Sequence, residues 1–225
     1  NFRIKKPCFY SSKFFPLIMR KSLKTKMEIE RAKQEKIREI IANLGNQIEV
    51  PDSVFDSTVF TQEMQDLSKT HWTPIRVATE AAKMLVTNER TRVLDVGSGC
   101  GKFCFVASLS GPGNFVGIEI RQNLYEIANR KKEKLGAHNV EFLLGDMSQL
   151  NWSNFDSFYL YNPFYENVAS YNQIDDAIPL TKEQFSRYTA TVTTQLRNCK
   201  TNTRVVTYHG FGGDMPSDYY CEETK

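Results

Sequence analysis

The residues best placed to do chemistry begin with a glycine-rich segment, Asp95-Val96-Gly97-Ser98-Gly99-Cys100-Gly101. It follows the β-prone run Thr91–Val96 and precedes an apolar stretch, so it is expected to connect a strand to a helix. Glycine has no Cβ, and three glycines at alternate positions let the backbone turn tightly and approach a ligand closely. The dinucleotide-binding spacing G-x-G-x-x-G is not met, because the third glycine comes one residue early and position 102 is lysine. The segment indicates a ligand-binding turn, or a tight connection without a ligand.

Acidic residues stand at the ends of the next two predicted strands. The run Asn114–Ile120 contains Glu119, which comes 18 residues after Gly101. A carboxylate at this place can accept hydrogen bonds from both hydroxyls of a ribose. The strand Val140–Leu144 continues into Gly145-Asp146-Met147. Each acid alone is better explained as a solvated cap or strand end, so the indication comes from their order.

These turns belong to a chain that alternates strands with helices. Hydrophobic patterns predict further helices and strands over Lys102–Leu109, Gln122–Leu135, Phe155–Tyr161, Lys182–Leu196 and Arg204–Tyr208. Such alternation implies parallel strands joined by right-handed crossovers. The expected fold is α/β, a doubly wound, mostly parallel open sheet that binds ligands at the carboxyl ends of its strands.

Together, the glycine turn, Glu119 and Gly145-Asp146-Met147 resemble motifs of the class I S-adenosylmethionine-dependent methyltransferases, over roughly Thr73 to Tyr208. The resemblance implies a Rossmann-like fold, S-adenosyl-L-methionine as cofactor, and methyl transfer as the activity. It places Gly97 and Gly99 beside the methionine part of the cofactor, and Asp95 near its amino group. Glu119 would hold the ribose, and Asp146 with Met147 would bracket the adenine. The cofactor-binding residues that it implies are Thr73, Asp95, Gly97, Ser98, Gly99, Gly101, Glu119, Ile120, Asp146, Met147 and Asn162.

The segment Asn162-Pro163-Phe164-Tyr165 resembles the Asn/Asp-Pro-Pro-Tyr/Phe signature of methyltransferases that act on nitrogen. In that signature the polar side chain and the next carbonyl accept hydrogen bonds from an amino group, and the aromatic ring stacks on a planar substrate. The resemblance implies that Asn162, Pro163, Phe164 and Tyr165 are the catalytic residues, although Phe164 replaces the second proline. In the alternative reading, Asn162 caps a turn and Phe164 fills the core.

A cationic amine must lose a proton before it accepts a methyl group. Tyr161, Tyr165 and Glu166 are candidates for that proton by position alone. The segment His71-Trp72-Thr73-Pro74 lies where members of the family place a stretch that closes over the cofactor. Thr73 is expected to act there or to cap a helix.

The methyl acceptor stays open between a protein side chain, a nucleobase and a small amine. A looser likeness to the non-SET histone-lysine methyltransferases, with Asn162-Pro163-Phe164 as its last element, adds a protein lysine as one possibility. Two other functions compete: a non-catalytic Rossmann-like binding domain, and a nicotinamide-dependent oxidoreductase, which needs the wider glycine spacing. The scattered residues His71, His138 and His209 form no metal-binding pattern, so no metal site is expected.

The chain of 225 residues is expected to have three parts: a basic flexible arm (1–26), a helical extension (27–70) and a cofactor-binding methyltransferase domain (71–225). The arm is interpreted as sequence outside the native start or as a transit peptide, with a nucleic-acid-binding arm as a third reading.

Charge and cysteine content bear on the partners and on the cell compartment. The net charge of +3 includes eight basic residues and no acid in residues 1–26, which leaves 21 basic against 26 acidic residues in the rest. The charge argument for a nucleic-acid substrate is therefore weak. No apolar run approaches the roughly 20 residues that span a bilayer, so no membrane partner is expected. The five cysteines are an odd number and lack the paired C-x-x-C spacing of a zinc site, so a reduced, cytoplasmic protein is expected.

Overall fold

The computed structural model describes residues 14–169, 171 and 173–224, with side chains from residue 25 onward. The chain divides into two compact units, Asn1–Glu39 and Ile40–Lys225. Residues 40–70, which the sequence analysis placed in a separate extension, thus belong to the larger unit. None of the helices in the described part is long and apolar enough to cross a membrane.

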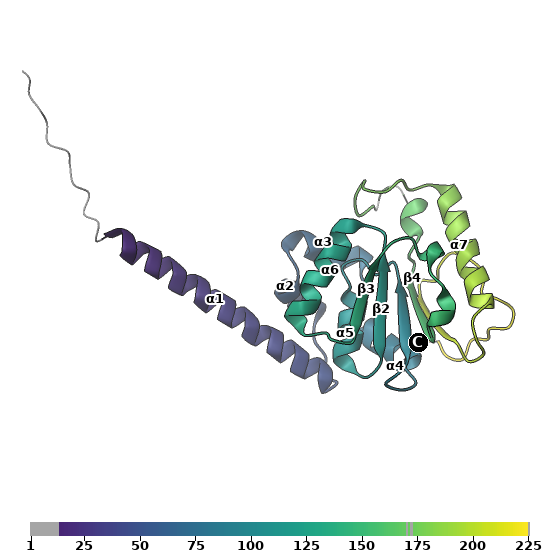
Figure 1. Cartoon of the computed structure of the whole chain (residues 1–225), viewed down its shortest axis with the longest axis horizontal. Helices are drawn as coiled ribbons and strands as arrows, with labels where there is room; N and C mark the ends of the chain where they lie inside the picture. The colour runs from purple at the N-terminus through teal and green to yellow at the C-terminus, as the bar shows by residue number, and fades with distance from the viewer. Residues whose placement is uncertain (1–13, 170, 172, 225) are drawn as a thin grey trace, which may run out of the picture. The chain divides into compact units, whose positions relative to one another are not determined.

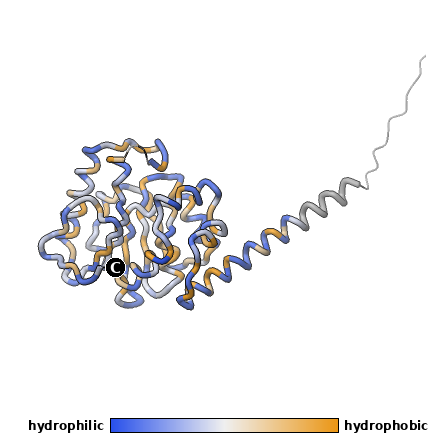
Figure 2. Tube along the Cα trace, turned by 180° about the vertical axis from the view of Figure 1, so that it is seen from behind, coloured by the Kyte–Doolittle hydropathy of each residue, from blue (hydrophilic) through white to orange (hydrophobic). Residues whose placement is uncertain are grey.

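The N-terminal helix α1 spans Phe14–Gly45 and begins earlier than expected. The arm predicted over residues 1–26 is therefore helical from Phe14 on, and its first 13 residues lie outside the described part. Residues 14–26 include lysines, methionine and leucine, which favour helices even without a clear hydrophobic period. Along its coloured part, α1 is mainly hydrophilic, with hydrophobic positions at intervals (Figure 2).

Five parallel strands form the sheet of the larger unit, in the order β3-β2-β1-β4-β5. Their bounds are β1 Arg92–Val96, β2 Asn114–Glu119, β3 Val140–Leu144, β4 Ser157–Tyr161 and β5 Arg204–Tyr208. Pairings such as Val96 with Ile118 and with Leu160 bring the carboxyl ends of the strands to one edge of the sheet. The expected doubly wound α/β sheet is confirmed (Figure 1).

Helices connect the strands and cover the sheet. They are α2 Asp52–Val59, α3 Gln62–His71, α4 Ile75–Leu85, α5 Lys102–Ser110, α6 Gln122–Leu135 and α7 Lys182–Arg197, with 3₁₀ turns η1 Met147–Gln149, η2 Trp152–Asn154 and η3 Tyr165–Asn167. The sheet grows from β1 through β2 to β3 in one direction, and from β4 to β5 in the other. Right-handed crossovers therefore place α5 and α6 on one face and α7 on the opposite face.

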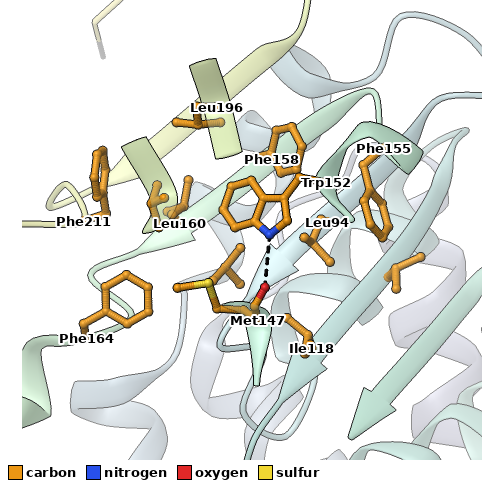
Figure 3. Packing of buried hydrophobic residues seen from close by; sticks show 13 residues of the cluster. Leu94, Ile118, Met147, Trp152, Phe155, Phe158, Leu160, Phe164, Leu196 and Phe211 are labelled. Carbon is orange, nitrogen blue, oxygen red and sulfur yellow. Dashed lines mark hydrogen bonds between the residues drawn. The ribbon is translucent and has the colours of Figure 1, made fainter. Parts of the chain in front are cut away.

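Alternation along β4 fills the core on both faces of the sheet. Tyr159 stacks on Phe103 of α5, with ring centroids 3.9 Å apart. Its neighbours Phe158 and Leu160 belong to the opposite cluster, which contains Trp152 and residues of α7 (Figure 3). Successive side chains of a strand point to opposite faces, and here both faces are covered, so β4 is buried from Ser157 to Leu160.

A buried lysine fastens α2 and α3 to the glycine turn. Lys102 is the first residue of α5, and its side chain is only 1% exposed. Its ammonium contacts Asp52 at 2.6 Å and Asp56 at 2.9 Å, and it donates to Ser68 Oγ at 2.9 Å. Asp52 also accepts from the backbone N–H of Ile75 at 3.1 Å. An ammonium in the interior needs such partners, so this cluster fixes the segment between α2 and α4 beside the turn.

We expect Lys102→Met to lower the free energy of unfolding by about 3 kcal/mol, because it leaves two carboxylates without their cation. Urea unfolding measures the loss. The matched variant Lys83→Met removes an exposed ion pair with Glu80 and should cost less than about 1 kcal/mol. Equal losses in the two variants would contradict the assigned role of Lys102.

Candidate active site

The glycine-rich turn after β1 adopts a backbone that needs glycine. Gly99 and Gly101 have φ values of +56° and +85°, which L side chains rarely adopt. A Cβ at Gly101 would lie 2.3 Å from Phe142 Cζ, and one at Gly99 would lie 2.9 Å from Trp72 Nε1. The turn therefore packs closely on β3 below it and on the segment that follows α3.

Glu119 closes this turn onto the end of β2. Its side chain is buried, and one carboxylate oxygen accepts from Gly99 N at 2.8 Å while the other accepts from Arg121 N at 2.8 Å. Burial raises the pKa of Glu119, and these backbone donors oppose that rise. Each carboxylate oxygen can accept a further hydrogen bond, so the group can still receive hydroxyls from a ligand.

A cavity of about 370 Å³ lies at this edge of the sheet. Ten of the predicted site residues line it: Gly97, Gly99, Glu119, Ile120, Asp146, Met147, Asn162, Pro163, Phe164 and Tyr165. The predicted residues Thr73, Asp95, Ser98 and Gly101 are not among the described residues that line it. Pockets for small molecules commonly have volumes of roughly 300–1,000 Å³, and this cavity falls in that range.

The four other predicted residues make their contacts within the protein. Thr73 Oγ shares a hydrogen bond of 3.0 Å with Tyr159 Oη, and Pro74 instead takes the cap position of α4. Ser98 is buried against Gly117 of β2, and a Cβ added to Gly117 would lie 2.6 Å from Ser98 Oγ. Gly101 occupies the left-handed N-cap of α5. Thr73 thus joins its segment to the sheet and does not cap the helix.

Asp95 is also buried, and it is not among the described residues that line the cavity. It accepts from Cys104 Sγ at 3.5 Å. Burial raises the pKa of Asp95 to about 7, the thiol opposes the rise, and the nearby Glu119 carboxylate adds to it. The side chain is therefore largely protonated below neutral pH, and its hydrogen bond to Cys104 lies inside the core.

Asp146 lies at the end of β3, where it caps η1. Its carboxylate accepts from Ser148 N at 2.8 Å and from Tyr188 Oη of α7 at 3.0 Å. Burial raises its pKa, but these bonds outweigh burial, so the pKa of Asp146 is lowered and the group is ionised at neutral pH. An ionised carboxylate can accept further hydrogen bonds from ligand N–H groups.

The turn after β4 forms the opposite end of the cavity. Asn162 has a φ of +39°, its N–H donates to Gly210 O at 3.0 Å, and its carbonyl accepts from Tyr165 N at 3.2 Å. A non-glycine residue in this conformation is strained, and such strain concentrates at functional sites. Phe164 is buried and stacks on Tyr188, so it both fills the core and lines the cavity. Tyr165 is 39% exposed.

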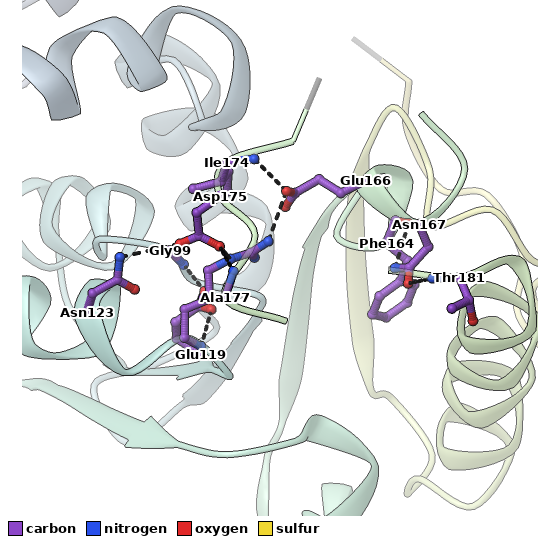
Figure 4. Close-up of polar contacts among 11 residues, drawn as sticks. Gly99, Glu119, Asn123, Phe164, Glu166, Asn167, Ile174, Asp175, Ala177 and Thr181 are labelled. Atoms are coloured by element: carbon purple, nitrogen blue, oxygen red, sulfur yellow. Dashed lines mark hydrogen bonds and ion pairs between the residues drawn. The ribbon is translucent and has the colours of Figure 1, made fainter. Parts of the chain in front are cut away.

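Arg121 connects the end of β2 to the loop after β4, and the sequence analysis did not single it out. Its side chain is 6% exposed and contacts Glu166 at 3.0 Å and Asp175 at 2.8 Å. Glu166 also accepts from Ile174 N at 2.7 Å, and Asp175 from Ala177 N at 3.1 Å (Figure 4). These ion pairs therefore attach the loop after β4 to Arg121, which lies two residues beyond the end of β2.

The segment after α3 supplies the last wall of the cavity through Thr70, His71 and Trp72. His71 is half-buried, and burial lowers its pKa, although Glu166 opposes the shift. Across the cavity, Tyr161 donates to Thr70 O at 3.4 Å. In the part of the chain that the structure describes, no cluster of His, Cys, Asp and Glu could hold a metal ion.

Comparison with known proteins identifies similar sequences and folds. A family model described as "Methyltransferase domain" matches residues 87–201. A tRNA (guanine-N(7)-)-methyltransferase of Synechococcus sp. (strain JA-3-3Ab) is 45% identical over 56 residues, which is 24% of each chain. The corresponding enzyme of Microcystis aeruginosa (strain NIES-843) is also 45% identical over 56 residues, 24% of this chain and 26% of that one. The chain thus spans about a quarter of the length of these curated relatives.

Among solved structures, an RNA methyltransferase from Salinibacter ruber in complex with S-adenosyl-L-homocysteine is 30% identical. The match covers 43% of this chain and 63% of that one, with a TM-score of 0.38.

The buried carboxyl of Asp95 predicts a pH dependence of stability. A carboxyl whose pKa is raised on folding stabilises the native state below its unfolded pKa, and this stabilisation is lost as the pH rises to about 7. Wild type should therefore lose about 2 kcal/mol more unfolding free energy than Asp95→Asn between pH 5 and pH 8. Urea unfolding at both pH values measures the difference. Parallel pH profiles would show that Asp95 does not titrate in this way.

Proposed function

The chain belongs to the methyltransferase domain family, and on that premise we propose that it transfers a methyl group from S-adenosyl-L-methionine to a nitrogen atom. The observation that carries the proposal is the convergence of four strand ends on one cavity. The glycine turn with Glu119, Asp146 and the Asn162 turn all line it. They come from the carboxyl ends of β1 to β4, where an open parallel sheet binds its ligands.

The residues present fit this cofactor. Gly99 lets the backbone of the turn lie directly against the indole of Trp72 at the cavity, since a Cβ there would lie 2.9 Å from Trp72 Nε1. The carboxylates of Glu119 and Asp146 are acceptors, and they suit the hydroxyls of a ribose and the amino group of an adenine. Ile120 and Met147 add apolar surface at the same end of the cavity. We therefore assign the adenosine part to the ends of β2 and β3, and the methionine part to the glycine turn.

The cofactor supplies a methyl group that its positive sulfur already activates. The protein then needs to align the acceptor and exclude water. We assign alignment to Asn162, whose carboxamide can accept a hydrogen bond from an amino group and which lines the cavity beside Pro163. The bonds from Arg121 to Glu166 and Asp175 hold the adjacent loop in place.

A cationic acceptor also needs a group that takes its proton. Glu166 is engaged with Arg121, and the pKa values of Tyr161 and Tyr165 are raised, by burial and by the bond to Tyr171 respectively. These phenols stay protonated at neutral pH, so they accept a proton poorly. We assign the role to His71, because it lines the cavity and burial keeps its imidazole neutral.

The acceptor is proposed as a nucleobase, a protein amine or a small amine. The relatives named as tRNA methyltransferases support a nucleobase. Among the described cavity-lining residues, Arg121 is the one lysine or arginine, and it is paired with two carboxylates. The cavity therefore suits a base or an amine better than a phosphate.

We also propose a cytoplasmic location. Four cysteines of the described part, Cys100, Cys104, Cys199 and Cys221, are free thiols. Free thiols are usual in reducing compartments.

We expect S-adenosylhomocysteine to bind with a micromolar dissociation constant, and NAD not to bind, in calorimetric titration. Glu119→Ala should weaken binding at least tenfold, because it removes the acceptor for the ribose hydroxyls and releases Gly99 N. The matched variant Glu141→Ala removes an exposed carboxylate of β3 and should bind as wild type does. Binding of NAD in place of S-adenosylhomocysteine would support the oxidoreductase alternative and refute this proposal.

Asn162→Ala should reduce methyl transfer at least tenfold while S-adenosylhomocysteine binding stays within about threefold, since one aligning hydrogen bond is lost. Transfer of radiolabelled methyl to tRNA, to a lysine-containing peptide mixture and to small amines measures it. Asn154→Ala, at an exposed asparagine that is not among the described residues lining the cavity, is the control and should transfer methyl as wild type does. Cofactor binding by wild type without transfer to any acceptor class would favour a non-catalytic binding domain.

A further inference from the structure

We propose that Trp72 binds the cofactor directly, by donating its indole N–H to the carboxylate of the methionine part. The inference rests on the proposed function, because it concerns the same cavity and the same ligand. It adds a donor at the glycine turn, contributed by the segment between α3 and α4.

The indole N–H of Trp72 is a buried donor without a partner. The residue is 6% exposed and lines the cavity. Its Nε1 has no hydrogen-bond acceptor in the described part of the chain. Buried polar atoms in native proteins are nearly always paired, so each exception calls for an explanation. A bound ligand that supplies the acceptor is such an explanation.

The polar edge of this indole faces the glycine turn. A Cβ at Gly99 would lie 2.9 Å from Nε1 and 3.2 Å from Cδ1. The backbone N–H of Gly99 is already taken, because it donates to Glu119. The unpaired indole N–H of Trp72 lies beside Gly99, on the turn to which we assign the methionine part of the cofactor. A ligand atom that reaches this turn is therefore close to the indole donor.

The second tryptophan of the chain shows the usual arrangement. Trp152 is fully buried, and its Nε1 donates to Met147 O at 3.3 Å (Figure 3). The two indoles are thus both buried, but one is satisfied inside the protein and the other is not. Trp152 is therefore a matched internal control.

Trp72 is held in place from several sides. Its ring packs on Phe60, with centroids 5.3 Å apart. The preceding helix is fixed where Ser68 accepts from Lys102, and the next residue, Thr73, is fixed by Tyr159. The indole is consequently oriented before a ligand arrives, which lowers the entropic cost of binding.

The donor-only character of an indole selects the ligand group. It must meet an acceptor, and among the parts of the cofactor the carboxylate is the negatively charged one. The acidic side chains Glu119 and Asp146 cannot bind a carboxylate, and Arg121 is paired with Glu166 and Asp175. A hydrogen bond from a neutral donor to a charged acceptor is also stronger than one between neutral groups.

Trp72→Phe tests the inference, because it keeps an aromatic ring and removes the N–H. Calorimetry compares S-adenosylhomocysteine with 5′-methylthioadenosine, which has the adenosine and the sulfur but lacks the amino acid part. We expect the variant to bind S-adenosylhomocysteine about tenfold more weakly than wild type does. Its dissociation constant for methylthioadenosine should stay within about twofold of the wild-type value. Trp152→Phe should lower the melting temperature and leave the ratio of the two affinities unchanged.

A second measurement needs no substitution at Trp72. In wild type labelled with ¹⁵N, the indole N–H resonance that persists in Trp152→Phe belongs to Trp72. It should shift downfield with S-adenosylhomocysteine and much less with methylthioadenosine. Equal shifts with both ligands, or an unchanged affinity ratio in Trp72→Phe, would overturn this inference alone. Wild type that binds neither ligand would overturn the proposed function, and the inference with it.

Discussion

The site depends on one buried carboxylate, that of Glu119. Removed from water, it must be supplied with hydrogen-bond donors, and it takes them from Gly99 on one side and Arg121 on the other. The first bond fixes the glycine turn against the end of β2. The second places Arg121, whose guanidinium then binds Glu166 and Asp175 of the loop after β4. A continuous set of polar contacts therefore runs from the glycine-rich turn to the loop after β4.

A second buried charge completes the cavity from the N-terminal side. Lys102 follows the glycine turn directly and binds Asp52, Asp56 and Ser68. Because these partners belong to α2 and α3, the segment that carries His71 and Trp72 is attached to the same turn that Glu119 holds. The helical segment before the sheet is thus part of the site, and its removal would open one wall of the cavity.

The strands and helices of the sheet were predicted well from the sequence, because hydrophobic period is a local property. The helix over Gln122–Leu135 and the strand over Val140–Leu144 were predicted with the bounds that the structure has. The start of α1 at Phe14 was missed, since its first turns begin with the apolar run Phe14–Met19, which shows no helical period. Thr73 was expected to cap a helix or meet the cofactor, but it bonds Tyr159, which is 86 residues away in sequence.

Contacts between distant segments could not be predicted from the sequence, because hydrophobic period and motif spacing describe only neighbouring residues. The pairing of Lys102 with α2, and that of Arg121 with Glu166 and Asp175, depends on the folded arrangement. The motif Asn162-Pro163-Phe164-Tyr165 shows how the two can combine. Phe164 was read either as a substrate-stacking ring or as core, and in the structure it is buried against Tyr188 and lines the cavity as well.

The most direct test of the account is a crystal structure of the full chain with S-adenosylhomocysteine. We expect the ribose hydroxyls at the Glu119 carboxylate, the adenine between Ile120 and Met147 with its amino group at Asp146, and the sulfur facing the Asn162 turn. A ligand bound elsewhere, or bound in this cavity with its adenosine away from Glu119, would contradict it.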